Sequence, residues 1–290
     1  TTECYLNLTV TATADKPLLT PGSASTFSEG QGPVAILPNL TLSDADDTEL
    51  IAATVTIASS RLSTDRLALP GSVSSLTGIT ASSYNSSTGV LTLSGRATVA
   101  DYQAALRAIT YENTSANPTN SGLSLTRGIQ FAVTDANSDG LGGQTSLTAT
   151  ATVTVDPLNA APALSAGMSV AYMENGTAIA LGSGVTISDA DDINLSGAVL
   201  EITSGYTSGD ALALVTQNGI SGSWNAGTHK LTLTGTRSLA NYQSAISAVT
   251  FSSSSDDPTA ISSTRQISIQ VTDANRDGAS TGQALSNTAG

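Results

Sequence analysis

The sequence has few of the residues that most catalytic and metal sites use. Its 290 residues include one cysteine and one histidine. Cys4 therefore has no partner for an internal disulfide, and it either bridges two chains or stays a free thiol. One cysteine and one histidine are too few for a zinc site, and they make a cysteine–histidine pair or a serine–histidine–aspartate triad implausible. The one histidine, His229, lies beside Lys230 at an expected hairpin tip, where a surface role is more common than a catalytic one. These absences favour a chain that is not an enzyme.

Positive charge and aromatic side chains are also scarce. The chain has 10 basic against 23 acidic residues, a formal net charge of -13, and only 4% aromatic residues. Nucleic acid and anionic membrane surfaces are therefore unfavourable partners. No apolar run approaches the roughly 20 residues that span a bilayer as a helix. What remains is rich in threonine, serine, alanine and glycine, a composition that suits long extracellular β-modules.

The second half of the chain repeats the first. Four motifs recur in the same order: Ser43-Asp-Ala-Asp-Asp47 at 188–192, the Leu-Thr-Leu run of 91–93 at 231–233, Thr126-Arg127 at Thr264-Arg265, and the Val-Thr-Asp-Ala-Asn run of 133–137 at 271–275. The offset falls only from 145 to 138 residues along this series. Two copies of one domain explain this, and each copy is long enough to bury its own core. We predict an N-terminal strand and linker at 1–17, a first repeat at 18–158 and a second repeat at 159–290.

Apolar and polar residues alternate in short runs throughout the chain. Residues 6–13 and 148–155 are clear cases, with aliphatic side chains on one face and threonine on the other. Period two with β-branched residues predicts half-buried strands, and Asn, Asp and Gly separate the runs as turn signals. One helical pattern occurs in each repeat, at 100–108 and 240–248. We therefore predict an all-β chain of two Greek-key, immunoglobulin-like β-sandwiches with a short helix in each.

Several ordered motifs together resemble the cadherin-like repeats of large bacterial surface adhesins. They are the run at 84–95, the helix and strand at 100–115 with Pro118, the Val-Thr-Asp-Ala-Asn endings, and the Asn159-Ala-Ala-Pro162 linker. The resemblance covers nearly the whole chain. It implies cadherin-like sandwiches in tandem on a cell-surface or extracellular rod, with calcium at the junctions between repeats. It also implies partners among flanking repeats, other copies of the chain, or cell-surface and matrix ligands. The family linker often carries Asp where this chain has Ala160, which removes one carboxylate.

Two loops carry a calcium-type pattern. Asp135, Asn137 and Asp139 precede a glycine, and Asp273, Asn275 and Asp277 recur in the same spacing. Closely spaced carboxylates and amides supply the oxygen ligands that calcium prefers, and the glycine allows a sharp turn. The twelfth position of an EF-hand loop would be Ser146 or Ala284, so these are not EF-hands. The alternative is a hairpin turn capped by its own Asn and Asp side chains.

Two acidic clusters are the other candidate ligands. Each places three carboxylates within five residues, which repel one another without a cation. The family resemblance implies that these clusters join a glutamate of each repeat and the junction residues as calcium ligands. This set contains Glu29, Asp44, Asp46, Asp47, Asp156, Asn159, Glu174, Asp189, Asp191 and Asp192. The alternative is a solvated acidic turn before a strand.

The two ends of the chain have complementary patterns. Residues 5–14 resemble the last strand and linker of the first repeat, with Leu6, Leu8, Val10 and Ala12 on one face. The second repeat, in contrast, is predicted to lack its closing strand. Donor-strand addition between copies would fill this vacancy and build a filament, because donor and acceptor lie at opposite ends. The alternative is that the sequence is a piece cut from a longer array.

Three functions stay open at this point. The first is a non-enzymatic extracellular structural or adhesive protein with calcium-stiffened repeats. The second is a self-polymerising extracellular filament subunit joined through its N-terminal strand. The third, from another class, is a carbohydrate-binding or hydrolytic module, since paired carboxylates for glycoside cleavage are available. The acidic residues recur in turn motifs of both repeats, which favours a metal or structural role over catalysis.

Overall fold

The chain divides into two compact units of β-structure. The computed structural model describes residues 3–71, 78–138, 140–167, 169–182, 184–277 and 286–289. Residues 1–118 and 124–156 form one unit, and residues 119–123 and 157–290 form the other. We call residues 18–158 the first repeat and residues 159–290 the second repeat.

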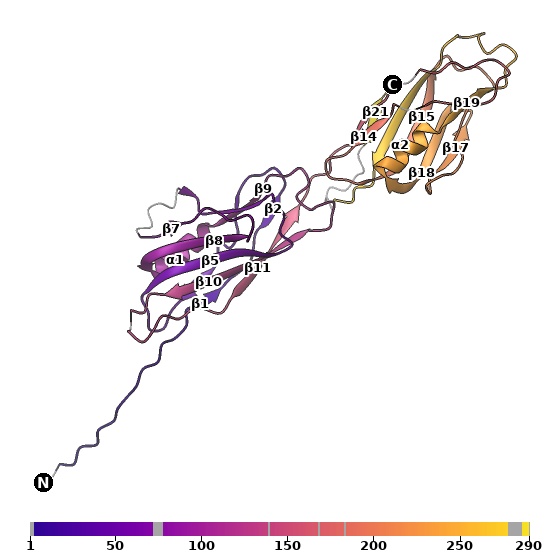
Figure 1. The fold of residues 1–290 in the computed structure, drawn as a ribbon. Coiled ribbons are helices and arrows are strands. Elements are labelled where there is room, and N and C mark those ends of the chain that lie inside the picture. The colour runs from indigo at the N-terminus through magenta and orange to yellow at the C-terminus, as the bar shows by residue number, and fades with distance from the viewer. Residues whose placement is uncertain are drawn as a thin grey trace. The chain divides into compact units, whose positions relative to one another are not determined.

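The first repeat contains eleven strands and one helix among its described residues. Their bounds are β1 Leu18–Thr20, β2 Thr26–Ser28, β3 Val34–Ala35, β4 Thr41–Ser43, β5 Glu49–Ser59, β6 Asp65–Ala68, β7 Thr80–Ala81, β8 Val90–Thr98, α1 Val99–Ala108, β9 Thr110–Asn113, β10 Thr126–Asp135 and β11 Ala149–Asp156. A six-stranded sheet has the order β2-β11-β10-β5-β8-β7, a three-stranded sheet has the order β3-β9-β6, and β1 pairs with β4 (Figure 1). Every pairing is antiparallel except that of β2 with β11.

The second repeat follows the same plan. Its elements are β12 Ala163–Ser165, β13 Ile179–Ala180, β14 Thr186–Ser188, β15 Asn194–Ser204, β16 Asp210–Ala213, β17 Ser221–Asn225, β18 Lys230–Ser238, α2 Leu239–Ser247, β19 Thr250–Ser253, β20 Gln266–Asp273 and β21 Ser286–Ala289. A five-stranded sheet has the order β17-β18-β15-β20-β21, and a three-stranded sheet has the order β13-β19-β16. Each repeat has its own buried cluster of aliphatic and aromatic side chains between its sheets. The prediction of an all-β chain with a β-sandwich in each repeat is confirmed.

The short helices form where the sequence predicts them. Each is capped by a hydroxyl: Thr98 accepts a hydrogen bond from the Asp101 amide at 3.1 Å, and Ser238 accepts one from the Asn241 amide at 3.3 Å. Such caps satisfy amides that the first helical turn leaves without a partner. A buried tyrosine fastens α1 to the sheet, because the Tyr102 hydroxyl donates to the Gly95 carbonyl at 2.6 Å. Within the described residues, no helix is both long and apolar enough to span a bilayer.

A buried ion pair lies in the same place in each repeat. Arg127 Nε is 2.7 Å from Asp65 Oδ2, and Arg265 Nε is 2.7 Å from Asp210 Oδ2. The Arg127 guanidinium also donates to the Pro118 carbonyl, and the Arg265 guanidinium to the Pro258 carbonyl. Buried charges persist only when they are paired and hydrogen-bonded in this way. The Thr-Arg motif of the sequence is therefore a structural feature of the sandwich.

The closing edges of the two sheets differ. In the first repeat β11 pairs with β10 over residues 126–131. In the second repeat, which we predicted to lack a closing strand, the four-residue β21 pairs with residues 269–272 of β20. The prediction is refined accordingly: β21 covers part of this edge. The strand predicted at 5–14 is not formed here: residues 3–17 contain no strand, and the part before Asp15 extends away from the first sandwich (the indigo trace in Figure 1). That part has no neighbouring strand among the described residues of the first repeat to pair with.

Candidate functional site

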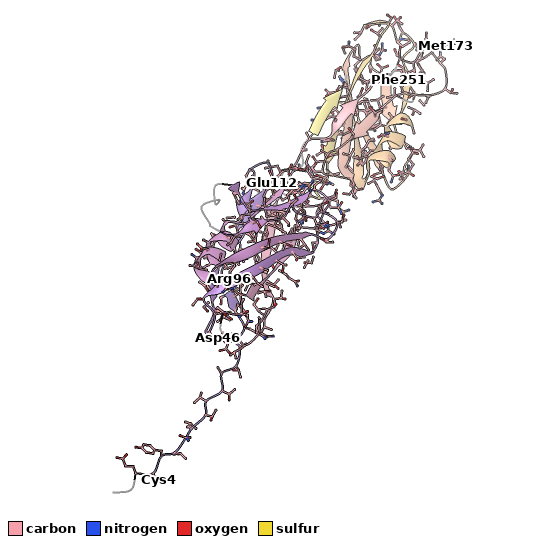
Figure 2. The ribbon with its side chains drawn as sticks, turned by 60° about the vertical axis from the view of Figure 1, so that its left-hand side comes forward. Cys4, Asp46, Arg96, Glu112, Met173 and Phe251 are labelled. Carbon is pink, nitrogen blue, oxygen red and sulfur yellow. The ribbon has the colours of Figure 1, made fainter. Side chains whose placement is uncertain are left out.

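The acidic cluster of the first repeat lies directly before β5. Ligand oxygens of Asp44, Asp46 and Asp47 lie within 4.8 Å of one another. The turn holds this arrangement itself, because Asp44 Oδ1 accepts hydrogen bonds from the amides of Asp46 at 3.2 Å and Asp47 at 3.0 Å. The incoming N-terminal segment adds one more contact, from the Asp15 amide to Asp46 Oδ2 at 2.9 Å. Figure 2 shows Asp46 where this segment meets the sandwich.

The loop after β10 lies against this acidic turn. The Ser138 amide and hydroxyl both donate to Asp47 Oδ1. The side chain of Asp135 is fully buried and accepts from the amides of Asn137 at 3.1 Å and Gln144 at 2.7 Å. The two predicted candidate sites of the first repeat are thus one feature. We call it the first carboxylate cluster: Asp44, Asp46, Asp47, Asp135 and Asn137.

The second repeat assembles the same feature with more buried acid. Asp189 Oδ1 accepts from the amides of Asp191 at 3.2 Å and Asp192 at 3.0 Å. The Ala160 amide donates to Asp191 Oδ2 at 2.8 Å, in the role that the Asp15 amide plays for Asp46. The backbone therefore keeps its contact although Ala160 lacks the carboxylate of the family pattern.

The loop after β20 completes this second feature. The Arg276 amide donates to Asp192 Oδ1 at 2.7 Å, and Asn159 Nδ2 lies 3.3 Å from Asp273 Oδ2. Asp273 and Asp277 are both fully buried. We call this the second carboxylate cluster: Asn159, Asp189, Asp191, Asp192, Asp273, Asn275 and Asp277. Linker, acidic turn and loop, which are far apart in the sequence, meet here.

The strand pairing explains why the turns and loops meet. β5 starts just after the first acidic turn, and β10 ends at Asp135; the two strands are antiparallel neighbours, with Asp135 opposite Leu50. In the second repeat Asp273 lies opposite Leu195 in the same manner. Antiparallel neighbours bring the start of one strand beside the end of the other. Each carboxylate cluster therefore forms at one end of its sheet.

Several carboxylate oxygens in these clusters are buried without a hydrogen-bond partner. They are Asp44 Oδ2, Asp47 Oδ2, Asp189 Oδ2, Asp191 Oδ1 and Asp192 Oδ2. Burial, followed by the neighbouring Asp189 carboxylate, raises the pKa of Asp191 to about 8. Burial also raises the pKa of Asp192 to about 6 and that of Asp44 above its ordinary value. Within the described residues, the lysine and arginine ion pairs involve acids outside both clusters, namely Glu49, Asp65, Glu201 and Asp210.

This chemistry suits a hard divalent cation. Calcium takes six to eight oxygen ligands from carboxylates, amides and carbonyls, and the clusters supply oxygen almost exclusively. Zinc and softer metals prefer nitrogen or sulfur, which neither cluster offers. A bound cation would supply the positive charge that crowded buried carboxylates need. The residues present therefore fit calcium.

Other predicted ligands fall outside these two clusters. Asp139 lies outside the described residues. The Asp156 carbonyl accepts from the Glu29 amide at 2.9 Å, so these two residues of the first unit lie together. Glu174 is exposed in a turn of the second unit. That Glu29, Asp156 and Glu174 join a junctional calcium site stays a prediction.

Sequence reasoning missed the contribution of Ser138 and of the linker backbone. Ser138 stands between two predicted ligands, and its counterpart in the second repeat is Arg276, so the repeat gave no signal for a hydroxyl there. Asp15 and Ala160 occupy equivalent places two residues before Pro17 and Pro162. Their shared role depends on the amide, which every residue except proline carries, so side-chain patterns do not reveal it.

Comparisons with known proteins give limited matches. No family model matches the chain. Halomucin of Haloquadratum walsbyi is 38% identical over 102 residues, which cover 35% of this chain and 1% of Halomucin. The structure of the protocadherin gammaB7 EC3-6 cis-dimer is similar with a TM-score of 0.33 and 16% identity, over 94% of this chain and 49% of that one. The protocadherin GammaB4 extracellular domain gives a TM-score of 0.32 and 17% identity, over 94% and 33%. The chain thus spans less than half of these proteins.

Proposed function

We propose that this chain is a non-enzymatic segment of an extracellular structural or adhesive protein, and that its two carboxylate clusters bind calcium. Duplicated sandwiches supply length and surface more readily than a single catalytic centre. The motif resemblance to cadherin-like adhesin repeats supports the same class of protein. The acidic composition, with a formal net charge of -13, supports it as well. Its partners would be neighbouring repeats, other copies of the chain, or cell-surface and matrix ligands.

The observation that carries the calcium proposal is the set of buried oxygens without a partner. Asp191 and Asp192 are 1% and 2% exposed, yet each has one carboxylate oxygen with no hydrogen bond. A buried charged group of this kind is costly unless a cation or a donor satisfies it. Calcium would be held by the carboxylates of Asp189, Asp191 and Asp192 with oxygens of the adjacent loop. It would fix the linker at Asn159 to the sheet end and so stiffen the chain locally.

The first experiment measures thermal unfolding with and without calcium. A ligand that binds only the folded state stabilises it by RT ln(1 + [L]/Kd), about 2.7 kcal/mol at a hundredfold excess over Kd. We expect the melting temperature of chelator-treated protein to rise on addition of millimolar calcium. Magnesium serves as the matched ion, because it requires a smaller and more rigid octahedron. Identical melting curves in calcium and in chelator would contradict the proposal.

Matched variants locate the effect. Asp192→Asn keeps the shape of the side chain and removes its charge, so it is expected to weaken calcium binding to the second cluster by tenfold or more, about 1.4 kcal/mol. Asp256→Asn makes the same change at an exposed loop position outside both clusters. Calorimetric titration of each variant gives the affinity directly. If Asp256→Asn lowers the affinity as much as Asp192→Asn does, the assignment of the site is wrong.

A further inference from the structure

A groove of about 670 Å³ runs along β20 in the second repeat. Its walls are largely apolar and come from both sheets: Tyr172, Ile179, Leu181, Phe251, Ile267 and Ile269. Figure 2 labels Phe251 and the exposed Met173 in this repeat. An apolar groove beside a strand edge is a ready site for a further strand.

The first repeat shows what belongs in this position. There β11 lies between β10 and β2, antiparallel to β10 over residues 126–131 and parallel to β2. It buries Ala151 at 6%, Val153 at 0% and Val155 at 2% exposure. Through these three side chains β11 closes the core of the first sandwich.

In the second repeat the described residues cover only part of the equivalent position. β21 pairs only with residues 269–272, whereas residues 266–268 pair with β15 on one side and, within the described part of the chain, with no strand on the other. The surrounding side chains are more exposed than their counterparts. Phe251 is 7% exposed against 0% for Tyr111, and the Arg265 side chain is 12% exposed against 0% for Arg127. The groove therefore lies over the part of the core around Phe251 and Arg265.

The N-terminal segment has the side chains that the groove lacks. Leu6, Leu8 and Val10 are 94%, 84% and 83% exposed, and they alternate with polar residues. Because the Asp15 and Ala160 amides make equivalent contacts, the segment before Asp15 corresponds to the segment before Ala160. Leu6, Leu8 and Val10 then take the places of the three buried residues of β11.

We propose that residues 5–14 of a second copy of this chain enter the groove and complete the sheet of the second repeat. The register of β11 transfers directly, so that Leu6 lies opposite Ile267, Leu8 opposite Arg265, and Val10 beside Tyr172. Ala12 continues the inward face beyond them. The inserted strand and β21 share one edge of β20 end to end. Donor and acceptor lie on different surfaces of the chain, so the contact is heterologous and propagates from copy to copy.

The first test is the size of the assembly. In sedimentation velocity we expect the intact chain to form oligomers whose size grows with concentration, and the chain without residues 1–14 to stay monomeric. Leu6→Asp places a charge opposite Ile267 in the apolar part of the groove and is expected to abolish assembly, whereas Thr9→Asp, on the outward face, keeps it. An intact chain that stays monomeric at high concentration overturns the proposal. So does a truncated chain that assembles like the intact one.

The second test isolates the binding step. A synthetic peptide of residues 3–16 is titrated into the chain without residues 1–14. We expect saturable binding, weakened about tenfold or more in the Leu6→Asp peptide and little changed in the Thr9→Asp peptide. Failure of the peptide to bind would overturn the proposal.

A cross-link tests the register. In a Cys4→Ser background, Asn7→Cys and Gln266→Cys are introduced together, since the proposed register places these outward residues opposite each other. Opposed strand residues have Cβ atoms about 4.5–5.5 Å apart, within reach of a disulfide after a small adjustment. Oxidation is expected to give a ladder of multimers on a denaturing gel. The shifted pair Asn7→Cys with Thr264→Cys is expected to give none, and equal ladders from both pairs would rule out this register.

Discussion

The two repeats keep the same buried ion pair but surround it differently. In the first repeat the Asp65 carboxylate accepts hydrogen bonds from Arg127, Tyr111, Asn113 and the Leu62 amide, and both charged side chains are 0% exposed. In the second repeat the Asp210 carboxylate accepts hydrogen bonds from the Thr207 amide and from Arg265. The difference teaches that a duplicated sandwich can keep its central ion pair while the polar network around that pair changes.

The largest expected effect comes from removing each arginine. Arg127→Met leaves the Asp65 charge buried without its counter-ion, which typically costs 3–5 kcal/mol. Arg265→Met is expected to cost less, because Arg265 lines the groove and its side chain is 12% exposed, so water can enter the place that the guanidinium leaves. Chemical unfolding of both variants measures the two losses, and the fluorescence of Trp224, the single tryptophan of the chain, reports the second repeat. Equal losses would contradict the view that the second network is partly solvated.

The sequence predicts the local features of the fold and of the candidate site better than the long-range ones. The helices and most of the strands follow from short patterns, and α1 and α2 lie within one residue of the predicted ranges. The buried ion pair could not be predicted, because Arg127 and Asp65 are 62 residues apart and no local sequence pattern links them. The merging of each acidic turn with its loop likewise depends on strand order, which the pairing of β5 with β10 determines. The amide contacts of Asp15 and Ala160 leave no trace in side-chain patterns.

An intermediate effect is expected from exchanging one hydroxyl between the repeats. The Tyr111 hydroxyl donates to Asp65 Oδ1 at 2.7 Å, and Phe251 occupies the equivalent place in the second repeat. Tyr111→Phe removes one hydrogen bond to a buried charge and should cost about 1.5–3 kcal/mol. Phe251→Tyr offers the same bond to Asp210 and should stabilise the second repeat by about 1 kcal/mol. A destabilising Phe251→Tyr would contradict the equivalence of the two positions.

The smallest expected effect is the pH dependence of the calcium-free second repeat. Burial raises the pKa of Asp191 to about 8 and of Asp192 to about 6, above the ordinary value of 3.8. The folded state therefore binds more protons than the unfolded state across this range, so stability is greatest at acid pH and falls as the pH rises from about 4 to about 8. Trp224-monitored unfolding in metal-free buffer at pH 5 and pH 8 measures this dependence. Calcium binds the ionised carboxylates, so adding it should stabilise the repeat more at pH 8 than at pH 5. Asp191→Asn with Asp192→Asn should flatten both dependences, and the same pH slope in that double variant would place the titrating groups elsewhere.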